Sequence, residues 1–219
     1  MTHRYALAGA SGLVGRELAR LVSADPACTE LHLLLRRPLP ALEALPHAHA
    51  VAWTSAAVPA LPRLDTALCA LGTTIATAGS QDAFRAIDFD AVLAFARHAH
   101  KAGAKRFAMV SALGADAGSA VFYNRVKGEI EQAVTKLGFE QLVIARPSLL
   151  LGDRVALGQP PRMGETMAQW FAPAVAWFMP RRLHPIRAEV VARAMLAALA
   201  EGRKGARVVE SDELQALGG

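Results

Sequence analysis

The sequence predicts an α/β protein built on a Rossmann-like, doubly wound parallel sheet. Short continuous apolar runs alternate with stretches of helical periodicity, a pattern typical of parallel strands covered by helices on both faces. A glycine-rich turn joins the first of these strands to the first helix. With 219 residues, of which 53% are hydrophobic, the chain is long enough to bury one sizeable core.

The expected strands are short apolar runs that end at a turn residue. Gly9 follows the first run, Arg36 the second, Gly72 the fourth and Pro147 the sixth. The third run lies inside a proline-rich stretch that is otherwise expected to be irregular. In chain order the strands are residues 5–8, 31–35, 51–53, 67–71, 106–110, 141–145 and 207–209.

The expected helices repeat apolar residues every three or four positions. Gly103 and Gly138 stand where glycine commonly ends a helix, and Ser119 is the expected N-cap of the third helix. In chain order the helices are residues 13–22, 89–101, 120–137 and 188–200. No repeat or low-complexity linker interrupts this pattern, so residues 1–219 are expected to form a single Rossmann domain with a small cap at about 152–187.

Charge and cysteine content exclude several classes of protein. The chain carries 24 Lys and Arg against 19 Asp and Glu, a net charge of +5 that is spread along its length, so no nucleic acid is expected as a partner. Cys28, expected in a loop, and Cys69, expected in a strand, lack the spacing of metal ligands, and no metal site is expected. No signal peptide and no transmembrane segment is recognisable. A cytoplasmic protein is therefore expected.

The turn after the first strand has the spacing G-x-x-G-x-x-G, formed by Gly9, Gly12 and Gly15. Glycine at these positions allows a tight turn, lets the backbone approach a pyrophosphate and lets the helix pack closely on the strand. The N-terminus of the helix offers unpaired N–H groups and the positive end of its dipole to phosphates. A dinucleotide is therefore the expected ligand.

Two arginines, Arg36 and Arg37, follow the second strand, where a fold that prefers NAD(H) often carries an acidic residue. Guanidinium groups can pair with the 2′-phosphate of NADP(H), and Arg16, just past the third glycine, could join them. NADP(H) is thus favoured as the cofactor, and NAD(H) stays open. The alternative role of Arg36 and Arg37 is a solvated charged turn.

Ser111, Tyr123 and Lys127 form the candidate catalytic group. Ser111 follows a predicted strand, and the carboxyl ends of parallel strands face the ligand crevice. Tyr123 and Lys127 are four residues apart and share one face of a predicted helix. A nearby ammonium favours the phenolate form of a tyrosine, which suits acid/base work at a carbonyl, and Ser111 would hold the substrate oxygen. The alternative is a purely structural Tyr–Lys pair.

These motifs, with Leu71-Gly72-Thr73-Thr74, YNRVKGE at residues 123–129 and Arg146-Pro147-Ser148, resemble the short-chain dehydrogenase/reductase superfamily. Within it, the chain is similar to the small atypical NAD(P)-binding proteins related to Tat-interacting protein 30. The resemblance covers most of the chain. It implies cofactor contacts from Gly9, Ser11, Gly12, Leu13 and Val14 at the pyrophosphate, Arg36 and Arg37 at the adenosine phosphate, Leu71, Gly72 and Thr73 after the fourth strand, Pro147 and Ser148 beside the nicotinamide, and Tyr123 and Lys127.

The favoured function is an NADP(H)-dependent oxidoreductase that transfers a hydride to or from a small carbonyl or alcohol substrate. An NADP(H)-sensing regulatory protein with little or no turnover is the alternative. A nucleotide-sugar epimerase is less favoured, because the segment after Lys127 is short for a substrate domain. The aromatic residues between Trp170 and Met179 suit an apolar wall for an apolar carbonyl, or the contact surface of a homodimer or protein partner.

Overall fold

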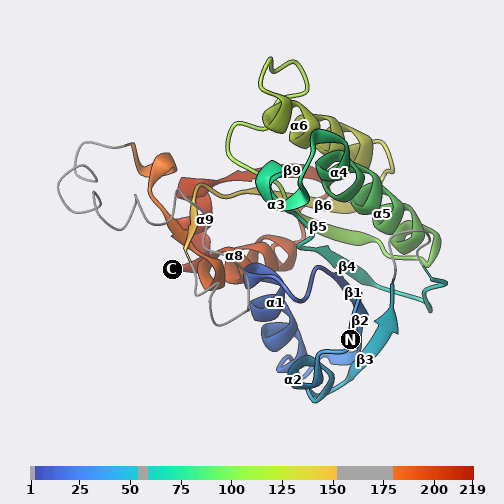
Figure 1. The fold of residues 1–219 in the computed structure, drawn as a ribbon. Coiled ribbons are helices and arrows are strands. Elements are labelled where there is room, and N and C mark those ends of the chain that lie inside the picture. Colours follow the sequence, from blue (N-terminus) through green and yellow to red (C-terminus); the bar gives the residue numbers. More distant parts are fainter. Residues whose placement is uncertain (1–2, 54–58, 152–179) are drawn as a thin grey trace.

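The protein has the predicted Rossmann-like α/β fold, seen in a computed structural model that describes residues 3–53, 59–151 and 180–219 (Figure 1). Within these residues, seven parallel strands form one sheet in the order β3-β2-β1-β4-β5-β6-β9. Its strands are β1 (His3–Ala8), β2 (Cys28–Leu35), β3 (Ala48–Ala52), β4 (Thr66–Cys69), β5 (Arg106–Val110), β6 (Gln141–Arg146) and β9 (Gly205–Glu210). A small second sheet pairs β7 (Leu150–Leu151) with β8 (Ile186–Arg187).

Helices cover both faces of the main sheet, as Figure 1 shows. The described helices are α1 (Leu13–Ser23), α2 (Pro40–Glu43), α3 (Ile75–Ala78), α4 (Gln81–Arg85), the π-helix η1 (Ala86–Ala91), α5 (Val92–Lys101), α6 (Phe122–Thr135), the 3-10 helix η3 (Arg181–Leu183), α8 (Ala188–Ala200) and α9 (Ser211–Gly218). Side chains of α1, α8 and α9 form one apolar cluster with the sheet, and those of α5 and α6 form the other. None of these helices combines the length and apolar character needed to cross a bilayer.

Strand side chains alternate between the two clusters, because successive residues of a strand point to opposite faces of the sheet. On β1, Tyr5 and Leu7 belong to the cluster of α1 and α8, whereas Ala6 and Ala8 belong to the cluster of α5 and α6. Both faces are therefore buried, which explains why the strands read as continuous apolar runs.

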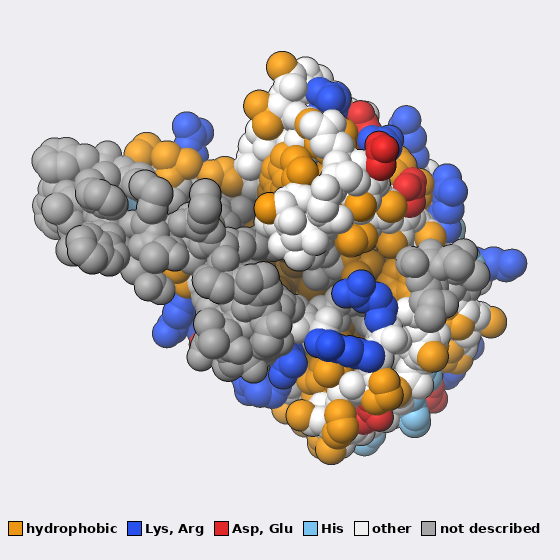
Figure 2. All heavy atoms as spheres, in the orientation of Figure 1, with side chains coloured by type: hydrophobic (Ala, Val, Ile, Leu, Met, Phe, Trp, Pro, Cys, Tyr) orange, Lys and Arg blue, Asp and Glu red, His pale blue; other side chains and the backbone are white. Residues whose placement is uncertain are grey.

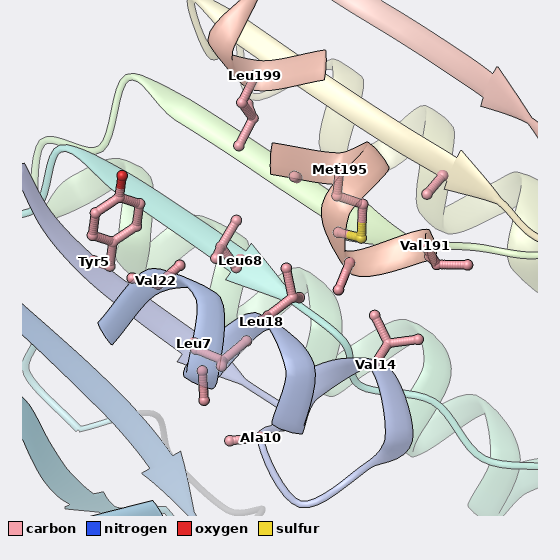
Figure 3. Close-up of a cluster of buried hydrophobic side chains, with 14 of the residues drawn as sticks. Tyr5, Leu7, Ala10, Val14, Leu18, Val22, Leu68, Val191, Met195 and Leu199 are labelled. Carbon is pink, nitrogen blue, oxygen red and sulfur yellow. The ribbon is translucent and has the colours of Figure 1, made fainter. Parts of the chain in front are cut away.

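Helices α1 and α8 pack against each other over the middle of the sheet (Figure 3). Each presents apolar residues at intervals of four, which places them on one face of the helix. The residues in question are Val14, Leu18 and Val22 of α1 and Val191, Met195 and Leu199 of α8. Burying a side chain of this size contributes about 1.5 to 3 kcal/mol. This packing fixes the position of α1, and hence of the helix N-terminus that follows the glycine turn.

Several elements begin or end at residues other than those predicted from the sequence. The third expected helix begins at Phe122, so Ser119 is not its N-cap; the Ser119 hydroxyl accepts a hydrogen bond from the N–H of Val121 (3.1 Å) in the turn before the helix. The helix expected at residues 89–101 starts earlier, because α4 and the π-helix η1 lead into α5 without a break. Cys28 lies at the start of β2 rather than in a loop, since its register pairs it with the first residue of β1.

The order of the strands reverses between β1 and β4. In open α/β sheets, the chain connections on the two sides of such a reversal run in opposite directions, and a crevice opens at the carboxyl ends of the two strands. The glycine turn follows β1, and residues 70–74 follow β4. Most of the expected cap at about 152–187, including its aromatic residues, lies outside the described residues.

Candidate functional site

A cavity of about 680 Å³ opens at the carboxyl ends of β1, β2, β4 and β5, on both sides of the strand reversal. Sites for cofactors and drug-sized molecules have volumes of roughly 300 to 1,000 Å³. In Figure 2 the viewed face is hollowed near its middle, and Lys and Arg side chains lie at the edge of the hollow. The lining residues that the sequence predicts as site residues are Gly9, Ser11, Gly12, Leu13, Val14, Arg36, Arg37, Leu71, Gly72, Thr73, Ser111, Tyr123 and Lys127.

The glycine turn needs glycine for two different reasons. Gly9 has a φ of +85°, and a Cβ there would lie 2.4 Å from the carbonyl carbon of Ala70. A Cβ on Gly15 would lie 2.0 Å from the carbonyl oxygen of Gly9, so α1 can start close to the sheet only with glycine at this position. Gly12 differs, because the nearest atom to its Cβ would be 3.4 Å away and the position borders the cavity.

The first turn of α1 has donors to offer to an anion. Gly12 is the N-cap residue, and no side chain caps the helix. The first N–H groups of a helix have no partner within the helix itself, and the helix dipole is positive at this end. The glycine turn and α1 therefore form a site that suits a phosphate.

Three arginines surround the same end of the cavity. The Nε of Arg16 is buried and has no hydrogen-bond partner within the described residues. Arg36 and Arg37 are exposed, and in the described part of the chain their side chains make neither an ion pair nor a hydrogen bond. The indole N–H of Trp53, which also lines the cavity, is another buried donor without a partner among these residues. Unpaired donors of this kind fit the phosphates of a dinucleotide.

Lys127 lies at the other end of the cavity and is buried with Asp88. Its ammonium contacts the Oδ1 of Asp88 at 2.6 Å, and the other carboxylate oxygen accepts a hydrogen bond from the N–H of Thr73 (2.9 Å). Burial alone would lower the pKa of Lys127, but the carboxylate of Asp88 and the neighbouring Tyr123 more than offset this, and the pKa is raised. Lys127 is therefore held as an ammonium. A Cβ on Gly72 would lie 3.7 Å from its Nζ, so the loop after β4 passes close to the pair.

Tyr123 lines the cavity one helical turn before Lys127 on α6. Its ring packs against Phe84 of α4, with 5.3 Å between the ring centroids and 40° between the planes. Both side chains thus come from the same helix face, as the four-residue spacing predicts. The ring contact with α4 fixes the tyrosine at the wall of the cavity.

Ser111 is buried at the end of β5, where it lines the cavity and donates its hydroxyl hydrogen to Glu131 of α6. Glu131 is itself 6% exposed and has a second partner in Arg146. The guanidinium of Arg146 reaches both carboxylate oxygens, with Nη2–Oε2 at 2.6 Å and Nε–Oε1 at 3.0 Å, and it also contacts Glu210 at 3.0 Å. Hydrogen bonding to Glu131 raises the pKa of Arg146 further above its ordinary value.

Two sequence-predicted residues, Pro147 and Ser148, are not among the residues that line the cavity. The Ser148 hydroxyl donates to the carbonyl oxygen of His184 and accepts from the Ser211 hydroxyl (3.0 Å). In the described residues, Ser148 therefore ties the end of β6 to the C-terminal helix α9.

Asp88 and Glu131 are the site residues that sequence reasoning missed. Tyr123, Lys127 and Glu131 follow one another at intervals of four, so the sequence does place Glu131 on the face of the helix that carries the other two. For Asp88 the signal is weaker: it is an acidic residue inside an apolar helical stretch. The partner of a buried carboxylate becomes visible only in the fold.

Comparison with known proteins places the chain among fungal relatives. It is 36% identical over 178 residues to "Protein fmp52, mitochondrial" of Emericella nidulans, covering 78% of this chain and 75% of that protein. It is 30% identical over 224 residues to "Protein FMP52, mitochondrial" of Eremothecium gossypii, covering 95% and 94%. No family model matches the chain. The likeness to the group of Tat-interacting protein 30 stays a prediction, because these relatives carry a different name.

The names of these relatives correct one expectation. Both are called mitochondrial, as is the FMP52 protein of Candida albicans, which is 34% identical over 169 residues and matches 74% of each chain. The expected cytoplasmic location is therefore wrong by this comparison. Composition and the lack of a recognisable signal peptide carry too little information to decide a compartment.

Several solved structures share this fold. MoeE5 in complex with UDP-glucose and NAD matches 96% of this chain and 79% of its own, with a TM-score of 0.71 and 14% identity. The ADP-L-glycero-D-manno-heptose-6-epimerase of Helicobacter pylori matches 97% and 80%, with a TM-score of 0.67 and 16% identity. At this identity the likeness concerns the fold alone, a Rossmann-like α/β fold.

Proposed function

The chain belongs to the FMP52 family, and we propose that it is an NADP(H)-dependent oxidoreductase of the short-chain dehydrogenase/reductase type. It would transfer a hydride between the cofactor and a small carbonyl or alcohol substrate. The observation that carries this proposal is that one cavity is lined both by the glycine turn and by Tyr123 and Lys127. A dinucleotide lying from one to the other would have its reactive end beside a tyrosine.

The cofactor, when bound, supplies or accepts the hydride. Tyr123 is proposed to give a proton to the carbonyl oxygen as the hydride arrives, or to take it back in the reverse reaction. Lys127 contributes a fixed positive charge one turn away, held in position by Asp88. Ser111 is proposed to contact the substrate by a hydrogen bond, because it lines the cavity at the end of β5.

Preference for NADP(H) is proposed from the arginines at the other end of the cavity. Arg16 has a buried Nε without a partner among the described residues, and Arg36 and Arg37 have no ion pair there. Three cations that have no acidic partner among the described residues suit the additional phosphate of NADP(H). Solved structures with this fold, such as MoeE5, bind NAD, so the fold alone does not select the phosphorylated cofactor.

The described residues also support the proposal that residues 1–219 form one cofactor-binding domain. Strand β9 and helices α8 and α9, which follow the expected cap, return to the same sheet and complete the cluster around α1. Residues 152–179 are proposed to supply substrate contacts. An apolar carbonyl is the proposed substrate class, in keeping with the aromatic residues of the sequence there.

Replacing Tyr123 by Phe tests the proposal. Tyr123→Phe removes the proton donor and keeps the ring that packs against Phe84, so we expect NADPH to bind with unchanged affinity. NADPH oxidation with a panel of small ketones and aldehydes should fall by about 100-fold or more, the contribution typical of a positioned acid/base group. Tyr5→Phe is the matched control, because Tyr5 is buried in β1 and does not line the cavity. Equal turnover of the two variants would contradict the assigned role.

An NADP(H)-sensing binding protein is the second candidate. Ser111 and Lys127 already have protein partners, Glu131 and Asp88, and this observation favours it. It predicts that NADPH binds and that no carbonyl of the panel is reduced. The same assay therefore separates the two functions.

A further inference from the structure

Ser111 connects the cavity with a part-buried ion pair. The residue lines the cavity, and its hydroxyl donates to the Oε1 of Glu131. The N–H of Ser111 donates to the carbonyl oxygen of Ala145 at 2.7 Å, which fixes the backbone at this point. Little freedom is left to a side chain that is 5% exposed.

The direction of the hydrogen bond from Ser111 follows from the chemistry of its neighbours. Arg146 remains a guanidinium at any ordinary pH, and it contacts both carboxylate oxygens of Glu131. A carboxylate paired in this way is ionised, and an ionised carboxylate can only accept hydrogen bonds. Ser111 has a single hydroxyl hydrogen, and that hydrogen is given to Glu131. The oxygen of Ser111 therefore has only lone pairs left for a ligand in the cavity.

Two further polar side chains, those of Lys127 and Tyr123, come to the cavity from α6. Lys127 is paired with Asp88 at 2.6 Å, whereas Tyr123 has a hydroxyl that can donate a proton. A ketone oxygen accepts hydrogen bonds and has nothing to give to Ser111. A substrate that satisfies both side chains needs an acceptor facing Tyr123 and a donor facing Ser111.

We propose that the substrate carries a hydroxyl group next to its reacting carbonyl, and that Ser111, oriented by Glu131 and Arg146, accepts the hydrogen bond from this hydroxyl. This inference rests on the proposed oxidoreductase function and names its substrate class, the α-hydroxy ketones and aldehydes. Glu131 is a positioning residue, because it acts on the substrate through Ser111.

The proposed reaction reduces the carbonyl group of the substrate to an alcohol. The carbonyl carbon of the α-hydroxy ketone accepts a hydride from NADPH, which is oxidised to NADP+, and the carbonyl oxygen accepts the proton of Tyr123. The tyrosine regains a proton from solvent. The product is a vicinal diol, whose first hydroxyl has kept its hydrogen bond to Ser111 throughout.

Three ketones that differ in one group test this inference. 2-Hydroxyacetophenone has the hydroxyl, 2-methoxyacetophenone has an ether oxygen without the hydrogen, and acetophenone has neither. Affinities are measured by calorimetry on the full chain, with and without NADP+, and NADPH oxidation is followed with each ketone. We expect the hydroxy ketone to bind about tenfold more tightly than the other two, the value of one well-formed hydrogen bond in a buried site.

Variants show whether Ser111 and Glu131 are responsible. In Ser111→Ala the ratio of affinities between the hydroxy and the methoxy ketone should fall to about one. Glu131→Gln should also lower this ratio of affinities, because Ser111 then no longer donates its hydrogen to a carboxylate. The matched control is Glu129→Gln, because Glu129 lies on α6 like Glu131 but pairs with Arg85 of α4 (2.6 Å) and not with Ser111. Because this ratio compares the affinities of one variant for two ketones, it does not depend on the stability of that variant.

The outcomes separate this inference from the proposed function. Equal affinities in the unmodified protein, no binding of any ketone, or a preference that survives in Ser111→Ala would overturn the inference. If the expected order of affinities appears but no ketone oxidises NADPH, the oxidoreductase function is wrong and the specificity of the cavity stands. If NADPH is oxidised at equal rates and affinities with all three, the function stands and the inference is wrong.

Discussion

Asp88 shows how a single buried carboxylate organises one end of the cavity. Its side chain is 0% exposed, and it contacts Lys127 from α6 and the N–H of Thr73 from the loop after β4. Two charges buried in this way stabilise the fold only as long as both are present, because each has lost its hydration. Asp88 therefore holds together a helix, a loop and the cation that faces the proposed reactive end.

Asp88→Asn should lower the free energy of unfolding by about 3 to 5 kcal/mol, since it leaves the ammonium of Lys127 buried without a counter-charge. Urea unfolding followed by circular dichroism measures the effect. The control is Asp90→Asn, because Asp90 lies on the same π-helix and is exposed. A loss no larger than that of the control would mean that the ion pair contributes little.

The pH dependence of stability has a definite sign at Lys127. Its pKa in the folded protein is raised above the ordinary value of 10.5, so the folded chain binds the proton more tightly than the unfolded chain. The stabilisation is fully present below the unfolded pKa and is lost as pH rises through the folded pKa. We expect the difference in unfolding free energy between the unmodified protein and Asp88→Asn to shrink as the pH rises above about 10.5, the ordinary lysine pKa. A constant difference would contradict this.

Among the elements, the turn from β1 into α1 contains two kinds of glycine. Close packing of the fold requires Gly9 and Gly15, whereas Gly12 is available to a ligand. Gly9 and Gly15 are enclosed by backbone atoms of Ala70 and of the turn itself, whereas Gly12 faces the cavity with an ordinary φ of −83°. The same sequence motif thus combines two constraints. Close packing fixes the helix, and the backbone at Gly12 is the proposed contact for the phosphate.

Gly15→Ala and Gly12→Ala should therefore have different effects. A Cβ on Gly15 meets a backbone oxygen at 2.0 Å, so we expect a loss of about 3 kcal/mol or more of stability, or failure to fold. Gly12→Ala should cost less than about 1 kcal/mol, the range for an N-cap change, and should weaken NADPH binding by about tenfold, because the methyl group displaces the phosphates. Thermal unfolding and NADPH titration measure the two effects. A Gly12→Ala variant with unchanged NADPH affinity would contradict a phosphate site at this turn.

At the scale of the whole molecule, the strand order decides where a ligand can bind. The reversal between β1 and β4 brings together residues that are far apart in the sequence, from Gly9 to Lys127, around one cavity. A ligand in that cavity contacts both halves of the sheet and binds only the folded chain. Its binding free energy therefore adds to the stability of the whole fold.

A thermal-shift titration with NADPH, NADP+, NADH and NAD+ uses this linkage. At about 100 times its dissociation constant, a ligand adds about 2.7 kcal/mol to the unfolding free energy. We expect a rise in melting temperature with the two phosphorylated cofactors and a smaller rise with NAD+ and NADH. In the double variant Arg36→Ala, Arg37→Ala this preference should disappear. The double variant Arg97→Ala, Arg203→Ala removes two exposed arginines elsewhere and should keep it. No shift with any of the four would contradict the dinucleotide site.

Local patterns in the sequence determine much of the fold and part of the site. Apolar runs predict the strands, because both faces of a parallel sheet are buried, and residues 106–110 and 188–200 match β5 and α8 at both ends. The helix capped by Ser119 was predicted wrongly at its start, since a side chain can cap a turn as readily as a helix. The compartment was also predicted wrongly, because composition does not encode it.

Residues close together in the chain encode the alternation of strands and helices, the glycine turn and the shared helix face of Tyr123 and Lys127. The packing of distant elements sets which groups these residues meet. Asp88 reaches Lys127 across 39 positions, and Glu131 is reached by Arg146 at the end of β6 and by Ser111 just after β5. Such pairs affect the stability of the fold because they are removed from water. A buried charge needs a partner within the protein, and the packing of the elements decides which residue that partner is.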